Sequence, residues 1–355
     1  MRKLWTSLDP RLKGFVVLAL CAFIPLVDSN PSHLNVLTDA ATFILLALGL
    51  NIVVGFAGLL DLGYAAFFAI GSYSYAMLAS GQFNIHIPFW VMLFVASSIA
   101  AIFGILLGAP TLRLRGDYLA IVTLGFGEIV PQTFLNLSQW TNGPNGIGPL
   151  DQPVLFNYRF GLHTLPYFYV GLALVALAIV VVHNLQDSRL GRSWMAIRED
   201  ELAAAHMGIN TTKAKLSAFA LGASFSGLAG VAYGSKLNLV SPDQFQFNVS
   251  IFVLSMLVLG GMGNIYGVIV GSFLLSALER FILPQATVFA HNLGFVNVDF
   301  SNFRFLMYGL ILVSIMLFRP EGLFPSRQRK AELHVAQLDE TLAQQEQSMY
   351  EEAIQ

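Results

Sequence analysis

Residues 88–110 read PFWVMLFVASSIAAIFGILLGAP and contain no charged side chain. A helix that crosses the roughly 30 Å hydrocarbon core of a bilayer needs about 20 apolar residues, because an α-helix rises about 1.5 Å per residue. Residues 165–182 are also free of charge and predominantly apolar. Both stretches therefore predict membrane-spanning helices.

The composition extends this prediction to the whole chain. Of its 355 residues, 55% are hydrophobic and 11% are charged, whereas soluble domains carry about 25% charged residues. The chain has no basic cluster with interleaved aromatic residues that could follow a phosphate backbone, so the sequence excludes a nucleic-acid-binding surface. The single cysteine, Cys21, excludes a disulfide framework, and the seven histidines lack the H-x-x-x-H spacing of zinc sites. We expect an all-α polytopic membrane protein without a cofactor.

The hydropathy pattern predicts about ten spans. Residues 245–278 are uncharged but too long for one span, and GGMGN at 260–264 divides them into two helices. The basic N-terminus resembles a signal peptide, but no small-x-small cleavage site precedes Asp28, so we interpret the first stretch as a retained helix. The predicted spans are residues 14–27, 34–54, 64–80, 88–110, 117–137, 165–183, 213–236, 245–259, 265–283 and 303–318.

The distribution of lysine and arginine predicts the orientation of these spans, because cytoplasmic loops carry an excess of positive residues. With both termini in the cytoplasm, 15 of the 19 lysine and arginine residues lie inside. Only Arg159, Lys236, Arg280 and Arg304 lie outside. The inside residues are Arg2, Lys3, Arg11, Lys13, Arg113, Arg115, Arg189, Arg192, Arg198, Lys213, Lys215, Arg319, Arg327, Arg329 and Lys330.

Residues 49–63, GLNIVVGFAGLLDLG, interrupt an apolar run with four glycines and two polar residues. At membrane depth, backbone groups that lose their hydrogen bonds at a helix break are tolerated only where they are buried in protein or line a water-filled cavity. The pattern is consistent with a broken or re-entrant segment near residues 55–80, in which Asn51, Gly55 and Gly58 line a translocation path. Close helix packing explains the same pattern, and the sequence leaves both readings open. For the GxxxG pairs at 104–108, 230–234 and 267–271 we expect packing.

Glu128 is a second candidate for the translocation path. It lies eleven residues beyond Asp117, which places it about 16 Å deep at about 1.5 Å per residue. An acid at that depth costs on the order of 3 kcal/mol and should face the bundle interior or water. Glu128 could hold a substrate ammonium group there. The alternative is a structural acid that is hydrogen-bonded to a neighbouring helix beside Pro131.

Residues 184–212 form the one substantial cytoplasmic loop of this topology. Within it, EDELAAAHMGIN at 199–210 places acids before an alanine-rich stretch and a glycine, which predicts a short helix. We divide the chain into a transmembrane domain, residues 1–325, which contains this loop, and an acidic cytoplasmic tail, residues 326–355.

Several motifs in order along residues 40–325 resemble one family. They are ALGLNIVVG at 47–55 with AGLL at 57–60, LRLRGDYLAIVTLGFGEI at 112–129, GPNGI at 143–147, VLGGMG at 258–263 and RPEGL at 319–323. With them the chain resembles the LivM-type permease subunits of branched-chain amino-acid importers of the ATP-binding cassette (ABC) class. Ala203, Ala204 and Gly208 are similar to the EAA loop of such permeases, although Glu201 stands one position before the Glu of that motif.

The resemblance implies a non-catalytic, multi-pass protein of the bacterial cytoplasmic (inner) membrane. Its implied partners are a LivH-like second permease subunit, two cytoplasmic ABC ATPase subunits and an extracytoplasmic amino-acid-binding protein. A coupling helix with Glu201, Ala203, Ala204 and Gly208 would dock into an ATPase. The chain lacks a G-x-x-x-x-G-K-[ST] phosphate loop.

Two other functions are compatible with the sequence. One is the same type of permease for urea, an amide or a sugar. The other is a secondary transporter, which would need paired charges along an ion path, whereas Glu128 stands almost alone within the predicted spans.

Overall fold

The structure is a computed structural model of the chain. It describes residues 21–28, 30–111, 114, 117–155, 157–161, 163–292, 300–319 and 321–325. Most of the predicted first span, residues 14–27, and the acidic tail, residues 326–355, lie outside the described residues.

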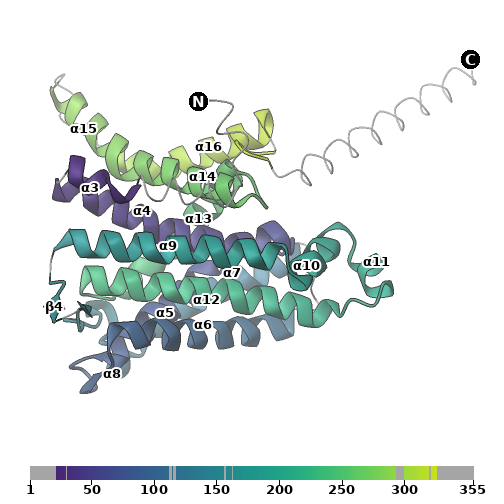
Figure 1. Cartoon of the computed structure of the whole chain (residues 1–355), viewed down its shortest axis with the longest axis horizontal. Helices are drawn as coiled ribbons and strands as arrows, with labels where there is room; N and C mark the ends of the chain where they lie inside the picture. The colour runs from purple at the N-terminus through teal and green to yellow at the C-terminus, as the bar shows by residue number, and fades with distance from the viewer. Residues whose placement is uncertain are drawn as a thin grey trace, which may run out of the picture.

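The described residues are mainly helical (Figure 1). The α-helices are α3 (Ile24–Val27), α4 (Pro31–Leu50), α5 (Tyr64–Leu78), α6 (Phe89–Thr111), α7 (Asp117–Asn136), α8 (Ser138–Thr141), α9 (Thr164–Gln186), α10 (Arg189–Glu199), α11 (Glu201–His206), α12 (Thr211–Leu237), α13 (Phe247–Gly260), α14 (Ile265–Ala277), α15 (Leu283–Asn292) and α16 (Arg304–Phe318). The π-helices are η1 (Asn51–Phe56) and η4 (Leu278–Ile282), and the 3-10 helices are η2 (Gly143–Asn145), η3 (Pro242–Phe245) and η5 (Phe300–Phe303). Two antiparallel hairpins pair β1 (Ala79–Ser80) with β2 (Ile85–His86) and β3 (Val154–Leu155) with β4 (Tyr158–Arg159).

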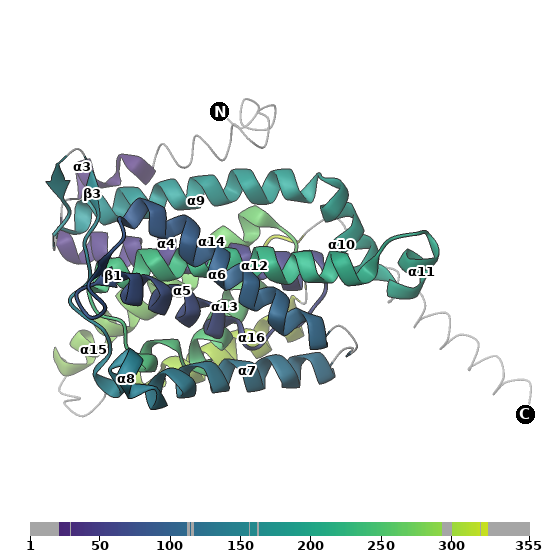
Figure 2. The ribbon, with the colours of Figure 1, turned by 90° about the horizontal axis from the view of Figure 1, so that it is seen from below.

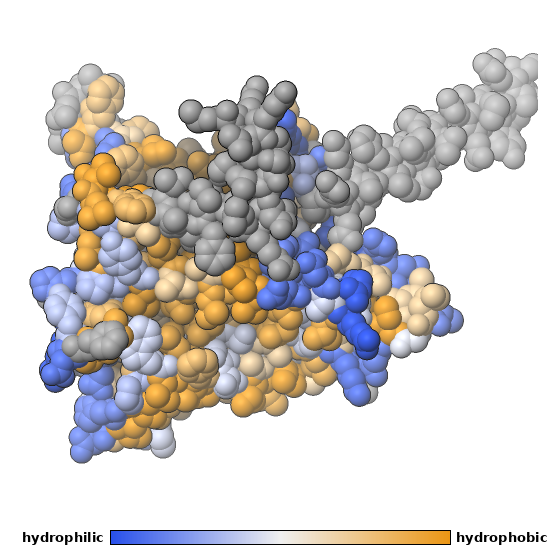
Figure 3. All heavy atoms as spheres, viewed as in Figure 1, coloured by the Kyte–Doolittle hydropathy of each residue, from blue (hydrophilic) through white to orange (hydrophobic). Residues whose placement is uncertain are grey.

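The long helices run between two ends of the molecule. One end carries α8 and the hairpins, and the opposite end carries α10 and α11 (Figure 1). Figure 3 shows hydrophobic residues over the middle of the visible face and hydrophilic residues towards both ends. A helical bundle with an apolar belt between polar ends is the arrangement that a bilayer requires, because every backbone group must be satisfied within the protein.

Helix α12 packs against α4, α5 and α6, and small residues permit the close approach. A Cβ on Gly230 would lie 2.6 Å from the backbone nitrogen of Ser72, and one on Gly104 would lie 2.7 Å from the carbonyl oxygen of Phe219. A Cβ on Gly271 would lie 2.6 Å from backbone atoms of α13. The packing interpretation is therefore confirmed at Gly104, Gly230 and Gly271.

Seven described helices are long and apolar enough to cross a membrane, and each coincides with a predicted span. They are Pro31–Phe56, Phe89–Thr111, Tyr118–Asn136, Thr164–Gln186, Thr211–Leu237, Pro242–Gly260 and Ile265–Phe289. The predicted spans at 64–80 and 303–318 correspond to α5 and α16, which contain 15 residues each. By length alone these two helices are short for a full crossing.

Both predicted interruptions are present in the backbone. Helix α4 passes into η1, and residues 57–63 leave the helical conformation before α5 begins. Leu62 N–H donates to Thr123 Oγ1 of α7 at 3.0 Å, and Gly63 N–H donates to Asp61 Oδ1 at 2.9 Å. These backbone groups therefore find partners within the protein. The second interruption, residues 261–264, separates α13 from α14.

Candidate functional site

The predicted loop helix is α11, and α10 holds it against the bundle. In α10 the Trp194 side chain is buried, and its Nε1–H donates to the carbonyl oxygen of Ala214 in α12 at 2.8 Å. Helix α11 begins at the N-cap residue Asp200, whose Oδ1 accepts hydrogen bonds from Leu202 N–H and Ala203 N–H at 2.8 and 3.0 Å. An N-cap acid satisfies two of the free amides at a helix start. Helix α10 is thus held against α12, and α11 follows it at the end of the molecule (Figure 1).

The four predicted coupling residues have different surroundings. Glu201 Oε1 accepts from Lys215 Nζ of α12 at 2.5 Å, and Ala204 is buried. Ala203 is exposed. Gly208 has a φ of +86°, and a Cβ built on it would meet no atom within 4 Å. Glu201 and Ala204 therefore lie on the side of α11 that packs against the rest of the protein, whereas Ala203 and Gly208 lie on its exposed surface.

Two apolar side chains that the sequence analysis did not single out also lie on that open surface. Leu202 is 57% exposed and Met207 is 84% exposed. Both lie at the end of the molecule that carries α10 and α11, away from the apolar middle of the bundle (Figure 1 and Figure 3). Their position in an otherwise charged loop was the available signal.

Asn51 and Gly55 lie where the two broken helices meet. Asn51 is fully buried, and its Oδ1 accepts from Gly263 N–H, in the connection between α13 and α14, at 2.9 Å. A Cβ on Gly55 would lie 2.0 Å from Asn51 Oδ1 and 2.8 Å from Gly263 N. Glycine at position 55 is therefore required for this contact between η1 and the α13–α14 connection.

Arg198 connects α10 to η1. Its Nη1 donates to the carbonyl oxygen of Gly55 at 2.5 Å. Gly58 has a φ of +68°, and a Cβ there would lie 2.8 Å from Arg198 Cγ. The sequence analysis counted Arg198 only as a cytoplasmic positive charge and did not predict this contact. The structure thus places Gly55 and Gly58 in contact with α10.

The C-terminal RPEGL motif closes over the α13–α14 connection. Leu323 N–H donates to the carbonyl oxygen of Leu259 at 2.9 Å, and Phe324 N–H donates to that of Gly260 at 3.1 Å. The Asn264 side-chain amide donates to the carbonyl oxygen of Phe324 at 3.0 Å. Two of the quoted sequence motifs, VLGGMG and RPEGL, are therefore in direct contact.

Glu128 lies apart from the residues at the break. It is exposed on α7 and lines a groove of about 310 Å³ between α7 and the η3–α13 segment. The expectation that Glu128 faces the bundle interior or water stays a prediction. The structural alternative of a hydrogen bond to a neighbouring helix is not seen within the described residues.

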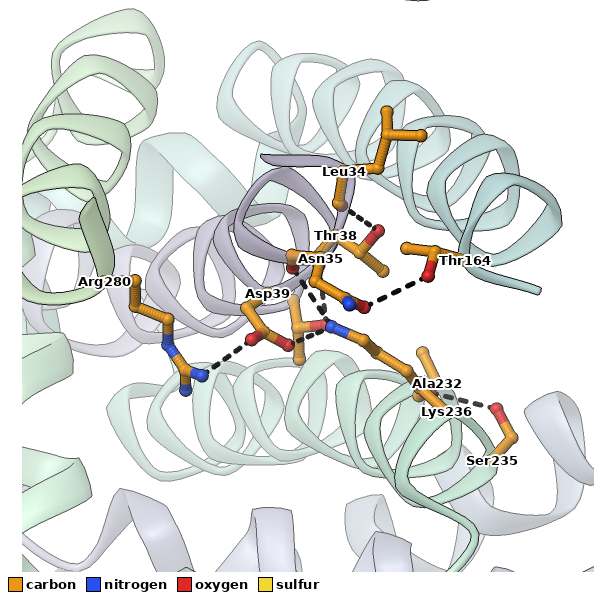
Figure 4. A network of polar contacts seen from close by, with 10 residues as sticks. Leu34, Asn35, Thr38, Asp39, Thr164, Ala232, Ser235, Lys236 and Arg280 are labelled. Atoms are coloured by element: carbon orange, nitrogen blue, oxygen red, sulfur yellow. Dashed lines mark hydrogen bonds and ion pairs between the residues drawn. The ribbon is translucent and has the colours of Figure 1, made fainter. Parts of the chain in front are cut away.

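Paired charges lie elsewhere in the bundle, contrary to the expectation that Glu128 stands almost alone. Asp39 of α4 lies between Lys236 of α12 and Arg280 of η4 (Figure 4). Its Oδ1 is 2.6 Å from Lys236 Nζ, and its Oδ2 is 2.7 Å from Arg280 Nη1. Three of the four cations assigned to the outside, Lys236, Arg280 and Arg304, border or enter this region, where Arg304 and Asp39 line a second cavity of about 390 Å³. Counting charges along the sequence could not show that they converge.

No group of three or more His, Cys, Asp and Glu side chains within the described residues could hold a metal ion.

Comparison with known proteins identifies the family. The family described as "Branched-chain amino acid transport system / permease component" matches residues 32–316. The chain is 38% identical, over 94% of its length and 79% of the relative's, to the high-affinity branched-chain amino acid transport system permease protein LivM of Salmonella typhimurium. It is 39% identical to LivM of Escherichia coli, over 90% of its length and 76% of the relative's.

The same chain is also related to a second kind of permease. It is 26% identical, over 69% of its length and 83% of the relative's, to the permease protein LivH of Salmonella typhimurium. No solved structure matches the chain. With a match across most of the transmembrane region, the chain belongs to the family of branched-chain amino acid transport system permease components.

Proposed function

We propose that this chain is the LivM-type permease subunit of an ABC importer and that it carries branched-chain and other hydrophobic amino acids. The observation that carries the proposal is the sequence identity of 38–39% to LivM proteins over 90–94% of the chain. The bundle of apolar helices supports a path through the membrane, and permease components of this kind are not catalytic. The chain's partners are a LivH-like second permease, two ABC ATPase subunits and an extracytoplasmic amino-acid-binding protein.

The proposed topology has ten spans, with both termini in the cytoplasm of a bacterial cell and the chain in its inner membrane. Five of the cytoplasmic cations, Arg189, Arg192, Arg198, Lys213 and Lys215, belong to α10 and the start of α12, at the end of the bundle that carries α11. The positive-inside rule supports placing that end in the cytoplasm. Residues 1–325 are then the permease domain and residues 326–355 a cytoplasmic tail.

Helices α10 and α11 together form the proposed coupling segment, which transmits the movement of the ATPases. Helix α11 docks into an ATPase subunit through its open surface, which includes Leu202, Ala203 and Met207, while the Glu201–Lys215 ion pair ties it to α12. A displacement of α11 moves α10, because the two helices are joined at Asp200. Arg198 then transmits the movement of α10 to η1 through Gly55 and Gly58.

The translocation path is proposed to involve two levels of the membrane. Asn51, Gly55 and Gly58 act near the cytoplasmic end, where η1 and the α13–α14 connection change their contact. Glu128 acts farther from that end, in the groove beside α13. The Asp39 network lies near the opposite end and its charges pair with one another, which suits a tie between helices better than an ion path of a secondary transporter.

Uptake of labelled leucine tests the proposal. Cells with and without the gene are compared in the presence of competing neutral amino acids, urea or ribose. We expect the deletion to remove a component of leucine uptake that amino acids alone compete away. Leucine uptake that is unchanged, without a redundant system to account for it, would move the substrate to another small solute and retain the permease assignment.

A further inference from the structure

Helix α7 carries polar side chains on a side that this chain leaves open. Of its apolar window only 28% is buried, whereas 89% of the corresponding window of Pro31–Phe56 is buried. Figure 2 shows α7 along one margin of the bundle and α9 along the opposite margin. Glu128 and Gln132, one helical turn apart, are both exposed on α7. This side of α7 therefore faces something other than the rest of the chain.

The groove beside α7 collects further polar groups. Its walls include the η3–α13 segment, and its volume is about 310 Å³. Five polar side chains line it, and within the described part of the chain none of them has a hydrogen-bond or ion-pair partner. They are Glu128, Gln132, Asp243, Gln246 and Asn248.

A buried hydroxyl near the groove is also unsatisfied. The Tyr73 side chain is buried, and its ring stacks on Phe134 of α7 with a centroid distance of 4.0 Å. Among the described residues, the Tyr73 hydroxyl finds no hydrogen-bond partner, and it interacts electrostatically with Asp243 of the groove. A buried polar group without a partner costs on the order of 1–3 kcal/mol. Because this hydroxyl is enclosed, it adds polar character to the contact between α5 and α7 beside the groove, whereas the polar contents of the groove itself are indicated by its five lining side chains.

Lipid is a poor occupant for this face. An ionised side chain at membrane depth costs on the order of 3 kcal/mol when it faces hydrocarbon. Helix α7 also exposes apolar side chains, such as Ile121 and Ile129, each 64% exposed, but an acid and an amide, Glu128 and Gln132, lie among them. The middle parts of the open faces of α9 and α16 present apolar side chains such as Leu177, 54% exposed, and Leu310, 58% exposed. Those two faces suit the bilayer, and the α7 face suits protein and water.

The family of this chain indicates which protein covers the exposed face of α7. LivM and LivH relatives are both named as permease proteins of one high-affinity transport system, and this chain is similar to both. We infer that the second permease subunit covers the face formed by α7 and η3–α13, and that the groove stays open beneath it as this chain's wall of the translocation path. The inference rests on the proposed function, since it requires a second permease subunit. Within the path, Glu128 and Asp243 attract the ammonium group of the substrate.

Site-specific cross-linking tests the inference in the assembled complex. In a chain with Cys21→Ser, single cysteines replace Gln132 or Asn248 in the groove, and Leu177 or Leu310 on the apolar faces. Each variant is coexpressed with a tagged LivH-like subunit, purified by that tag and labelled with benzophenone maleimide for photocrosslinking. A second sample is treated with a small charged thiol reagent. Copurification with the tag shows which variants assemble, and only those are scored.

We expect Q132C and N248C to cross-link to the tagged subunit and to react with the charged reagent, and L177C and L310C to do neither. Cross-links to the tagged subunit from L177C or L310C, with none from Q132C or N248C, would overturn the assignment of the face. If Q132C and N248C cross-linked to the tagged subunit but did not react with the charged reagent, the inference that the groove stays open as part of the path would be wrong. Neither readout depends on the solute carried, so a failure of leucine uptake would reject the proposed substrate and leave this result standing.

Discussion

Arg198 is the residue at which α10 contacts η1, the π-helix that follows α4. Its guanidinium donates to the carbonyl oxygen of Gly55 at 2.5 Å, and its stem covers Gly58. We predict that Arg198→Lys lowers coupled leucine uptake by about tenfold and leaves ATPase activity in place, because a lysine lacks the planar fork of donors. A hydrogen bond from a charged group is worth on the order of 1.5–3 kcal/mol. The measurement compares uptake and ATP hydrolysis in proteoliposomes.

Arg192→Lys is the matched control for Arg198→Lys. Arg192 stands on the same helix, and its Nη1 donates to the carbonyl oxygen of Asp187, the C-cap of α9, at 2.7 Å. It should leave the ratio of uptake to hydrolysis unchanged. If Arg198→Lys also left this ratio unchanged, Arg198 would act only through its positive charge, which lysine retains.

Glu128 has no hydrogen-bond or ion-pair partner among the described residues, so its charge is free to act on a solute. We predict that Glu128→Gln leaves the folded yield unchanged and raises the leucine concentration for half-maximal uptake about tenfold, which corresponds to about 1.4 kcal/mol of lost attraction. Gln132→Ala, one turn away on the same groove, controls for local packing. Parallel losses of folded protein and of transport in Glu128→Gln would favour a structural role instead.

At the scale of the element, α11 depends on the turn that ends it. Gly208 has a φ of +86° with open space around it, a conformation that proline, fixed near −65°, cannot adopt. We predict that Gly208→Pro inserts normally but uncouples ATP hydrolysis from uptake, because α11 loses its orientation. Gly208→Asn should retain coupling, since asparagine tolerates a positive φ. The docking assignment fails if the proline variant transports leucine with unchanged coupling.

At the scale of the whole molecule, the helices were predictable because lipid imposes its own length and composition on a span. The windows at 88–110 and 165–183 could be placed within a few residues of α6 and α9. Contacts between residues far apart in the sequence were not predictable, because hydropathy does not indicate which residues contact each other in the fold. Arg198 and Gly55 are 143 positions apart, and Asp39 and Lys236 are 197 apart. The sequence indicated the candidate residues of the coupling loop and the break, and only the fold showed that Arg198 connects them.

The Asp39 network ties the layers of the bundle together. The Asp39 carboxylate joins α4 to α12 through Lys236 and to η4 through Arg280. The Asp39 side chain is only 9% exposed and that of Lys236 only 11%. We predict that Asp39→Asn lowers the free energy of unfolding by about 3–5 kcal/mol, because it leaves the largely buried ammonium group of Lys236, and the partly exposed Arg280, without their carboxylate. Thermal unfolding of the purified complex, with binding of a thiol-reactive dye to Cys21 as one readout, measures the loss.

Two further variants separate a tie between helices from a general effect of removing a carboxylate. Asp28→Asn changes an exposed acid paired with His33 and should alter the unfolding midpoint little. Asp39→Asn combined with Lys236→Met should regain part of the lost stability, because it removes one of the unpaired charges. Uptake per folded molecule should remain near that of the unmodified protein in both Asp39 variants. If Asp39→Asn instead abolished uptake at an unchanged unfolding midpoint, the network would belong to the translocation path, and the outer end of the bundle would need a transport role of its own.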